Sequence, residues 1–499
     1  MLFLRSSAKI GLNVSMALLM LAAPCAVARN QAPKKPASTP SAPAKKPHAV
    51  AKKDQDPDIA QIIKEVSPQR VQQTIEKLVT FGTRHTLSVN NPGASSSSQG
   101  IVAARNWIKS EFERISSECN GCLEVKTDTF VEQPRTRAAS DESTTGQPPR
   151  NRIPVPTEIQ NVYAILKGTD PAQAKRIYLV TGHYDSRNSD PLNSTAAAPG
   201  ANDDGSGTAV SLECARVLSK HRFPATIIFL TVAGEEQGLN GSTHFAKMAK
   251  EQGWQLEGVL NNDIVGGNTT PGDTAQNKNV VRVFSEGIPA AATEADLRRI
   301  RSVGGENDSS SRLLARYVDS VSKTYDFGTF SPKLIFRRDR YLRGGDHSAF
   351  NDSGFAAVRF TEYREDYTHQ HQNVRTENGI EYGDLPKFVD FNYVANVARL
   401  NAATLAALAS SPAPPAGVGL LTRQLENDSK IQWTASPGAT AYEVLWRATP
   451  DADFSPGNMM RTTETNVDVP DSKDNVIFGV RSVDAKGHKS LIVIPEPER

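Results

Sequence analysis

Four short stretches of this 499-residue chain combine side chains that bind metal ions. They are Gly182-His183-Tyr184-Asp185, Asn202-Asp203-Asp204-Gly205, Glu235-Glu236 and Asn262-Asp263. Together they supply one imidazole, several carboxylates and a pair of adjacent glutamates. Zinc takes imidazole nitrogen and carboxylate oxygen together, and a bridged pair of zinc ions needs this mixture of ligands. The four stretches therefore predict a two-metal hydrolytic site.

Each stretch has a simpler interpretation when it is taken alone. Glu235-Glu236 by itself is typical of a solvated acidic turn, and the segment from Asn202 to Gly205 is typical of an Asx turn or a calcium-like loop. The combination favours the metal site, because the right ligand types recur in one order along the chain.

The elements that must position these side chains follow from the hydrophobic pattern. A buried strand is expected at 177–182, directly before His183, and further strands at 225–232 and 258–264 precede or contain the other acids. Asp203 lies in a turn that leads into a helix. The carboxyl ends of strands in an open α/β sheet form the functional crevice, so these side chains are expected to meet there.

The same pattern predicts one large α/β domain over residues 57–410. Its strands are apolar runs without alternation, which indicates a mostly parallel central sheet covered by helices on both faces. A further strand is expected at 356–360. Helices are expected at 59–81, 100–115, 206–220, 240–252 and 384–408.

The end of the chain has a different composition. Residues 411–415 form a Pro-rich linker, and residues 416–499 contain short alternating runs separated by turn residues. Such runs predict a small all-β sandwich.

The first residues predict export. Arg5 and Lys9 precede a short apolar run, and Ala26-Val27-Ala28 offers a signal-peptidase site, so residues 1–28 are expected to be a signal peptide. The run is too short for a convincing membrane span, and no stable span is expected after cleavage. Residues 29–56 are expected to be a disordered Pro/Ala/Lys spacer. The mature protein is expected in the periplasm or outside the cell.

Charge and cysteine usage agree with this compartment. The chain has a formal net charge of +2, but its leader and spacer are basic, so the remainder is mildly acidic and nothing argues for nucleic-acid binding. Cys119 and Cys122 are expected to form a local disulfide, as exported proteins allow, and Cys214 is expected to be a buried thiol.

Residues 60–409 resemble the co-catalytic dizinc exopeptidases, which include bacterial leucine aminopeptidases and glutamate carboxypeptidase. The resemblance rests on the four stretches above and on their order. It implies two zinc ions per chain. One would be held by His183 and Asp263, and the other by Glu236 and a downstream histidine, with Asp203 bridging them. The remaining roles concern two acids: Asp185 would orient His183, and Glu235 would act as general base.

The downstream histidine has two candidates. The family usually shows Tyr-His-Thr-x-x-Asp here, with the acid four residues after the ligand. His369 is followed at that offset by Asn373, whereas His371 is followed by Arg375. His369 is therefore the preferred ligand, with His371 as the alternative.

Three further features bear on function. His347, in Gly344-Gly345-Asp346-His347-Ser348, could bind substrate or cap a helix. A basic cluster at 337–343 could be a solvated face or could bind a substrate carboxylate. The C-terminal segment resembles a fibronectin type III domain, in which Trp433 would pack under a tyrosine, although Phe478 replaces that family's usual corner tyrosine.

The resulting functional prediction is an exported zinc-dependent aminopeptidase that removes N-terminal residues from peptides. A water bridged by two zinc ions would attack the scissile carbonyl, and Glu235 would take its proton. A carboxypeptidase, a dipeptidase or a glutaminyl cyclase of the same fold are the alternatives. A catalytically inactive binding protein is disfavoured, because the ligands are retained. The sandwich is expected to bind a protein or cell-surface ligand, with a purely structural role equally compatible.

Overall fold

A computed structural model of the chain describes residues 55–134, 152–454 and 458–499. The expected signal peptide and nearly all of the expected spacer lie outside these residues. No helix within the described ranges is both long and apolar enough to cross a membrane.

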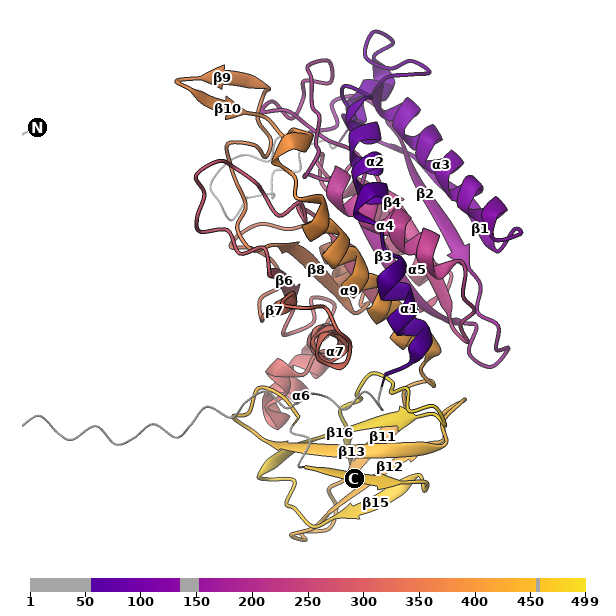
Figure 1. Cartoon of the computed structure of the whole chain (residues 1–499). Helices are drawn as coiled ribbons and strands as arrows, with labels where there is room; N and C mark the ends of the chain where they lie inside the picture. Colours follow the sequence, from indigo (N-terminus) through magenta and orange to yellow (C-terminus); the bar gives the residue numbers. More distant parts are fainter. Residues whose placement is uncertain (1–54, 135–151, 455–457) are drawn as a thin grey trace, which may run out of the picture. The chain divides into compact units, whose positions relative to one another are not determined.

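The larger part of the molecule is built on an eight-stranded sheet with the order β1-β2-β4-β3-β5-β8-β6-β7 (Figure 1). Its strands are β1 (Leu123–Glu132), β2 (Thr157–Leu166), β3 (Arg176–His183), β4 (Thr226–Val232), β5 (Gln255–Asn262), β6 (Val280–Ser285), β7 (Ser331–Ile335) and β8 (Ala357–Glu362). The four central strands β4, β3, β5 and β8 are parallel to one another. The expected α/β class with a parallel centre is confirmed.

The edges of the sheet make it mixed. β1 and β2 form an antiparallel pair that joins β4 in antiparallel orientation, and β6 is antiparallel to β8 but parallel to β7. The sequence pattern identified the central strands because they are buried on both faces. It did not predict β1, β2, β6 or β7. The residues of β1 alternate between exposed and partly buried positions.

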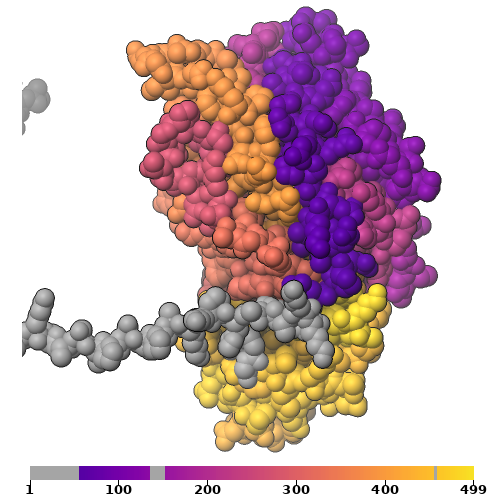
Figure 2. Space-filling model, viewed as in Figure 1, coloured from indigo at the N-terminus to yellow at the C-terminus, as the bar shows by residue number. Residues whose placement is uncertain are grey.

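Helices cover both faces of this sheet. They are α1 (Pro57–Glu65), α2 (Pro68–Val79), α3 (Gly100–Glu118), α4 (Gly205–Leu218), α5 (Asn240–Glu251), α6 (Glu294–Val303), α7 (Ser310–Thr324), α8 (His347–Asp352) and α9 (Phe391–Ser410), with short 3-10 helices at Thr86–Asn90, Gly305–Asn307 and Pro386–Phe388. One core cluster joins α1 to α4 and α9 with one face of the sheet, and a second joins α5 and α8 with the other face. In Figure 2 the indigo surface of α1 and α2 lies beside the orange surface of α9, on which both helices pack.

Two expected helices differ from those observed. The helix expected at 59–81 is divided, because Ser67 is extended and caps α2, and Pro68 occupies the first turn of α2. The helix expected from residue 384 begins only at Phe391. There the side chain of Asp390 accepts hydrogen bonds from the next free amides, so it defines the start of α9.

The C-terminal residues form two sheets, as the alternating runs predicted. The first has the order β15-β12-β11-β17 and the second the order β14-β13-β16. Their strands are β11 (Ala416–Leu421), β12 (Ser429–Thr434), β13 (Ala441–Ala448), β14 (Met459–Thr462), β15 (Asn466–Val469), β16 (Val476–Val483) and β17 (Glu496–Glu498). A two-stranded hairpin, β9 (Arg375–Glu377) with β10 (Ile380–Tyr382), lies outside both sheet systems.

The core between these two sheets contains the expected aromatic pair. The rings of Trp433 and Tyr442 lie edge to face with their centroids 5.2 Å apart, and both residues are buried. Phe478 is buried in the same cluster. The likeness to a fibronectin type III domain stays a prediction.

The C-terminal sheets are attached to the larger part more firmly than a Pro-rich linker suggests. Leu313 of α7 packs with Leu445 and Phe454 of the sandwich. Beside them, buried Asp308 receives two hydrogen bonds from Arg447, at 2.8 and 2.7 Å. Buried contacts therefore join the sandwich to the larger part across the Pro-rich segment at residues 411–415.

Candidate metal centre

The predicted ligands lie at the carboxyl ends of neighbouring parallel strands. β3 ends at His183, while Glu235 and Glu236 follow β4 after a two-residue turn, and Asp263 follows β5 directly. Since β4, β3 and β5 are adjacent and parallel, their ends meet at one edge of the sheet.

The start of α4 brings Asp203 to the same edge. Asp204 caps this helix by accepting the amide of Gly207 at 2.9 Å, and it also accepts the amide of His183 at 2.9 Å. A β-carbon on Gly207 would overlap the backbone oxygen of Asn262, so only glycine permits this approach of α4 to β5. The turn itself is held by buried Asp384, which accepts the amides of Asn202 and Asp203.

Five side chains from these ends, together with His371 from the loop between β8 and β9, form two groups that could each hold a metal ion. The first group is His183, Glu235 and Asp263, and the second is Asp203, Glu236 and His371. Within each group the ligand atoms lie within 4.8 Å of one another.

Asp203 connects the two groups. Its Oδ1 lies 3.2 Å from His183 Nε2, and its Oδ2 lies 2.9 Å from His371 Nε2. One oxygen therefore faces each group, which is the arrangement of a carboxylate shared between two ions.

The donors fit a pair of zinc ions. Apart from His371, whose side chain is 29% exposed, and Glu235, the group residues are buried. His183 Nε2 and Glu236 Oε1 make no hydrogen bond within the described ranges, although each lies beside another ligand atom. Imidazole nitrogen and carboxylate oxygen atoms that lie close together without a hydrogen bond are suited to bind the same cation of borderline softness.

The electrostatics also favour a cation. The pKa of Glu235 is raised well above its usual range: burial is the largest cause, His183 opposes it, and the carboxylates of Asp263 and Glu236 add to it. Burial is likewise the largest cause of the raised pKa of Asp263. Like charges crowded out of water disfavour their own ionisation, and a bound cation removes that penalty.

Asp185 occupies the position expected of an orienting residue. It is fully buried, and its Oδ1 lies 3.4 Å from His183 Nδ1, while its backbone oxygen lies 3.1 Å from the same atom. Its Oδ2 also accepts the amide of Glu236 at 3.2 Å. One carboxylate thus fixes both the histidine ring and the turn that carries the glutamates.

The two glutamates differ in their surroundings. Glu236 is 2% exposed, and Arg187 donates to its Oε2 at 2.8 Å. Glu235 is less deeply buried and lines the adjoining cavity. A fixed, buried glutamate suits a ligand, and one that faces a cavity suits a group that exchanges protons with a substrate.

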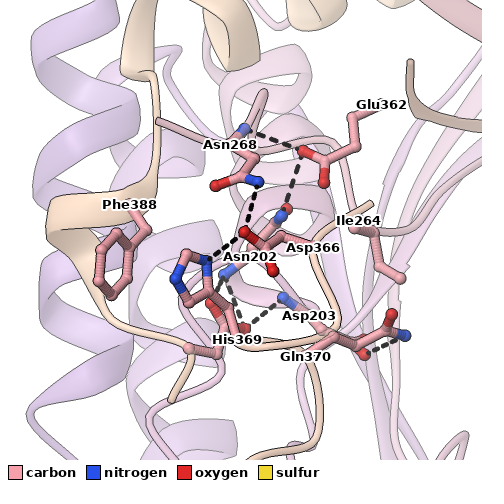
Figure 3. A pocket seen from close by; sticks show the side chains of 10 residues that line it. Asn202, Asp203, Ile264, Asn268, Glu362, Asp366, His369, Gln370 and Phe388 are labelled. Carbon is pink, nitrogen blue, oxygen red and sulfur yellow. Dashed lines mark hydrogen bonds and ion pairs between the residues drawn. The ribbon is translucent and has the colours of Figure 1, made fainter. Parts of the chain in front are cut away.

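The choice of His369 as the last ligand needs correction. His371 Nε2 lies 2.9 Å from Asp203 and 3.1 Å from Glu236, whereas His369 belongs to neither group. Figure 3 shows the ring of His369 beside Phe388, on which it stacks with centroids 3.7 Å apart, and Asp366 lies on its other side. The four-residue offset did not identify the ligand, because the loop turns His369 onto Phe388 and brings His371 to the carboxylates.

The other candidates from the sequence were His347 and the basic cluster at 337–343. His347 is buried at the start of α8, where its Nε2 contacts the backbone oxygen of Arg338 at 2.8 Å, and it does not line the cavity. Of the basic cluster, Arg340 and Arg343 line the cavity, whereas Arg337 is exposed and lies over Tyr341.

Three supporting residues were not predicted. Arg187 contacts Glu236 and also His371 Nδ1 at 2.5 Å, Arg359 pairs with Asp263 at 2.8 Å, and Asp384 holds the turn before α4. Arg187 lies two residues after Asp185, which is a weak sequence signal. Arg359 is an arginine inside an apolar strand run, and a charge there usually has a buried partner.

The site opens into a cavity of about 580 Å³. The cavity is lined by Asp203, Glu235, Glu236, Asp263 and His371, together with arginines and polar side chains of the surrounding loops. Fold and site together define an α/β protein with two adjoining metal-binding groups at the carboxyl edge of its sheet.

Residues 161–390 match the sequence pattern of Peptidase family M28. A probable zinc metalloprotease of Pyrenophora teres f. teres is 44% identical over 448 residues, which cover 89% of this chain and 87% of that protein. One of Leptosphaeria maculans is 42% identical over 444 residues, covering 88% and 97%. The chain belongs to Peptidase family M28.

The chain is similar in structure to LapA, an aminopeptidase from Legionella pneumophila, with a TM-score of 0.46 and 19% identity. The match covers 71% of this chain and 75% of that one. Similar solved structures also include an aminopeptidase from Aneurinibacillus sp. strain AM-1, with a TM-score of 0.46, 15% identity and coverage of 70% and 95%. A glutaminyl cyclase from Fimbriiglobus ruber has a TM-score of 0.44, 18% identity and coverage of 68% and 95%.

Proposed function

We propose that this protein is an exported aminopeptidase that uses two zinc ions per chain. The observation that carries the proposal is the pair of His/carboxylate groups joined by Asp203 and open to a cavity of about 580 Å³. The similar fungal proteins named as probable zinc metalloproteases support zinc as the metal. The leader-like N-terminus supports export.

His183, Asp263 and Asp203 would hold one ion, and Asp203, Glu236 and His371 the other. When bound, zinc ions at such a site acidify a water molecule and polarise the scissile carbonyl. The chain's own residues supply the rest. Glu235 faces the cavity and is placed to take a proton during attack and return it to the leaving amine, while Asp185 keeps the His183 ring in position.

The preference for an aminopeptidase follows from the carboxylates at the floor of the cavity. A free α-amine can pair with a carboxylate there or coordinate a metal, and acetylation removes both options. We therefore expect tetrapeptides with a free amine to be cleaved much faster than their N-acetyl forms, with C-terminal amidation of these tetrapeptides having little effect.

A carboxypeptidase or dipeptidase is the second candidate, because Arg340 and Arg343 line the same cavity. Equal rates on free and acetylated tetrapeptides, with a strong loss on amidation, would assign the protein to that class. A glutaminyl cyclase would instead convert N-terminal glutamine to a cyclic product without releasing an amino acid, which mass spectrometry of the products distinguishes.

The metal part of the proposal has its own test. Elemental analysis of the purified wild-type chain should give about two zinc ions, and Asp203→Asn should lose most of them together with nearly all activity. Full activity after exhaustive chelation would contradict the mechanism. N-terminal sequencing of the mature protein tests export, with Arg29 as the expected first residue.

A further inference from the structure

The cavity above the candidate metal centre is lined by basic as well as acidic side chains. Besides the carboxylates of the two metal groups, four guanidinium groups line it, and these belong to Arg152, Arg187, Arg340 and Arg343. Lysine is absent from this lining, and among the described residues the wall offers planar donors that match carboxylate geometry.

Two of these arginines are held by the protein itself. Arg187 donates to Glu236 and contacts His371, so it positions the second metal group. The side chain of Arg340 is only 9% exposed, and its donors are directed to Asp339 and Glu365. Neither has a donor clearly available to a substrate.

Arg343 is different. Its side chain is 33% exposed, and it pairs with Glu365 at 2.7 Å and contacts the hydroxyl of Tyr367 at 3.1 Å. Glu365 is shared with Arg282 and Arg340, and Arg340 also pairs with Asp339, so two carboxylates face three guanidinium groups. Arg343 is the most exposed of these three arginines, and it lines the cavity.

Arg152 adds a second exposed guanidinium to the same cavity. It donates to the backbone oxygen of Glu236 at 2.8 Å. Within the described ranges, no carboxylate forms an ion pair with it. Its remaining donors are therefore placed beside the metal group without a charged partner from the described residues.

The charge of the cavity depends on the metal centre. Four carboxylates line the cavity, and two divalent ions would match their charge. Of the four lining arginines, Arg152 then has no carboxylate partner among the described residues, and Arg343 shares Glu365 with two other arginines. Such a surface attracts a carboxylate and repels an ammonium group. Under the proposed function the substrate's free amine lies at the metal groups, so a carboxylate held by the arginines belongs to the leaving side of the scissile bond.

We infer that the protein prefers substrates with a carboxylate close to the scissile bond on the leaving side, bound by Arg343 with Arg152. This inference rests on the proposed aminopeptidase function. The carboxylate has two possible sources: the α-carboxylate of a dipeptide, or the side chain of an aspartate or glutamate in the second position. Both present the same planar acceptor to a guanidinium group.

Four leucyl substrates separate these sources. Leu-Ala against Leu-Ala-amide tests the α-carboxylate, and Leu-Glu-amide against Leu-Gln-amide tests the side chain at nearly constant size. We expect kcat/KM to favour the carboxylate form of at least one pair by roughly 10- to 100-fold, the range for a hydrogen-bonded charge pair. Preference in the first pair identifies a dipeptide substrate, and preference in the second identifies an acidic residue.

Variants connect the preference to the arginine. Arg343→Gln should reduce the carboxylate-to-amide ratio of kcat/KM by about tenfold or more, and Arg152→Gln should reduce it to a smaller extent. Arg337→Gln is the matched control, because Arg337 belongs to the same basic cluster but is exposed and outside the cavity lining, and its ratio should equal that of the wild type.

Binding gives a readout independent of turnover. Titration calorimetry on zinc-loaded Glu235→Gln should show tighter binding of Leu-Glu-amide than of Leu-Gln-amide, or of Leu-Ala than of Leu-Ala-amide. If the wild type cleaves all four substrates with equal kcat/KM, the inference is wrong while the proposed function stands. If it cleaves none of them, the proposed function fails, and equal affinities in the calorimetry would then reject the inference as well.

Discussion

At the scale of single residues, the adjacent pair Glu235-Glu236 divides two tasks. Glu236 is buried and held by Arg187, and Glu235 faces the cavity. We expect Glu235→Gln to keep its zinc yet lose kcat by about 10²–10⁴-fold, because an amide cannot accept the proton. Glu236→Gln should instead lower zinc affinity, because an amide oxygen is a weaker ligand.

Zinc content and kcat measured on the same preparations decide these roles. Zinc loss in Glu235→Gln with retention in Glu236→Gln would exchange the two assignments. Thermal unfolding of the metal-free proteins shows whether either variant is simply misfolded.

The two histidines of the same loop make a second residue-scale prediction. His371→Ala should lose zinc and most activity, because His371 Nε2 lies beside Asp203 and Glu236. His369→Ala should keep zinc, because its ring stacks on Phe388 and lies outside both metal groups. Stoichiometric zinc in His371→Ala together with loss of zinc in His369→Ala would restore the sequence-based choice.

Buried Glu362 predicts a pH dependence of stability. Burial raises its pKa from 4.5 to about 8, although Asn202 donates to it. The folded state therefore binds its proton more tightly than the unfolded state does, and the stability from this group is complete below pH 4.5 and is lost as the pH rises toward 8. Over that window the loss is on the order of a few kcal/mol.

Glu362→Gln keeps an acceptor and removes the titration. Its Tm at saturating zinc should match the wild type near pH 4.5 and exceed it by several degrees at pH 8. A constant Tm difference across this range would show that Glu362 does not titrate in it.

At the scale of elements, the site depends on the close contact of α4 with β3 and β5. A β-carbon on Gly207 would overlap Asn262, and the capping carboxylate of Asp204 lies against the same position. Gly207→Ala should therefore shift the start of α4 and move Asp203, which lies two residues before the helix. We expect reduced zinc content and a stability loss of about 1–3 kcal/mol, as overpacking causes.

The matched control is Gly305→Ala. Gly305 lies in a 3-10 turn where the nearest atom to a new β-carbon is Val303 Cγ2 at 3.5 Å, which is an ordinary contact. Urea unfolding and zinc analysis on both variants compare a crowded and an open glycine. Wild-type zinc content in Gly207→Ala would mean that the loop adjusts without moving Asp203.

At the scale of the whole molecule, the C-terminal sheets are part of one folded unit with the peptidase part. Asp308 pairs with Arg447 of β13 and also with Arg316 of α7, and both arginines are buried. Arg447→Met should destabilise the protein by about 3 kcal/mol, the lower end for a broken buried pair, because Arg316 remains.

Urea unfolding at fixed zinc concentration measures this effect. Arg461→Met is the control, because the Arg461 side chain is 54% exposed and lies 4.0 Å from Glu443, and its effect should stay within about 0.5 kcal/mol. Two separate transitions in wild-type unfolding would contradict a single cooperative unit.

Much of the catalytic architecture could be predicted without coordinates. The strands before His183, Glu235 and Asp263 are buried on both faces, so their apolar runs are unbroken and their ends are evident. Strands β1, β2, β6 and β7, helices α6 and α7, and the division of α1 from α2 were missed. An exposed edge carries a weak hydrophobic signal, and the Ser-Pro break was not weighed against the continuing helical period.

The sequence by itself determined the ligand types and their order, because each short motif is fixed to the end of a strand by only a few covalent bonds. Only the tertiary structure decided that His371 rather than His369 reaches Asp203. The path of a loop depends on contacts with distant parts of the chain, such as the stacking of His369 on Phe388. The same holds for the pairing of Asp308 with Arg447, which are 139 residues apart. Contacts between segments that far apart leave no local pattern, so they appear only when the chain is folded.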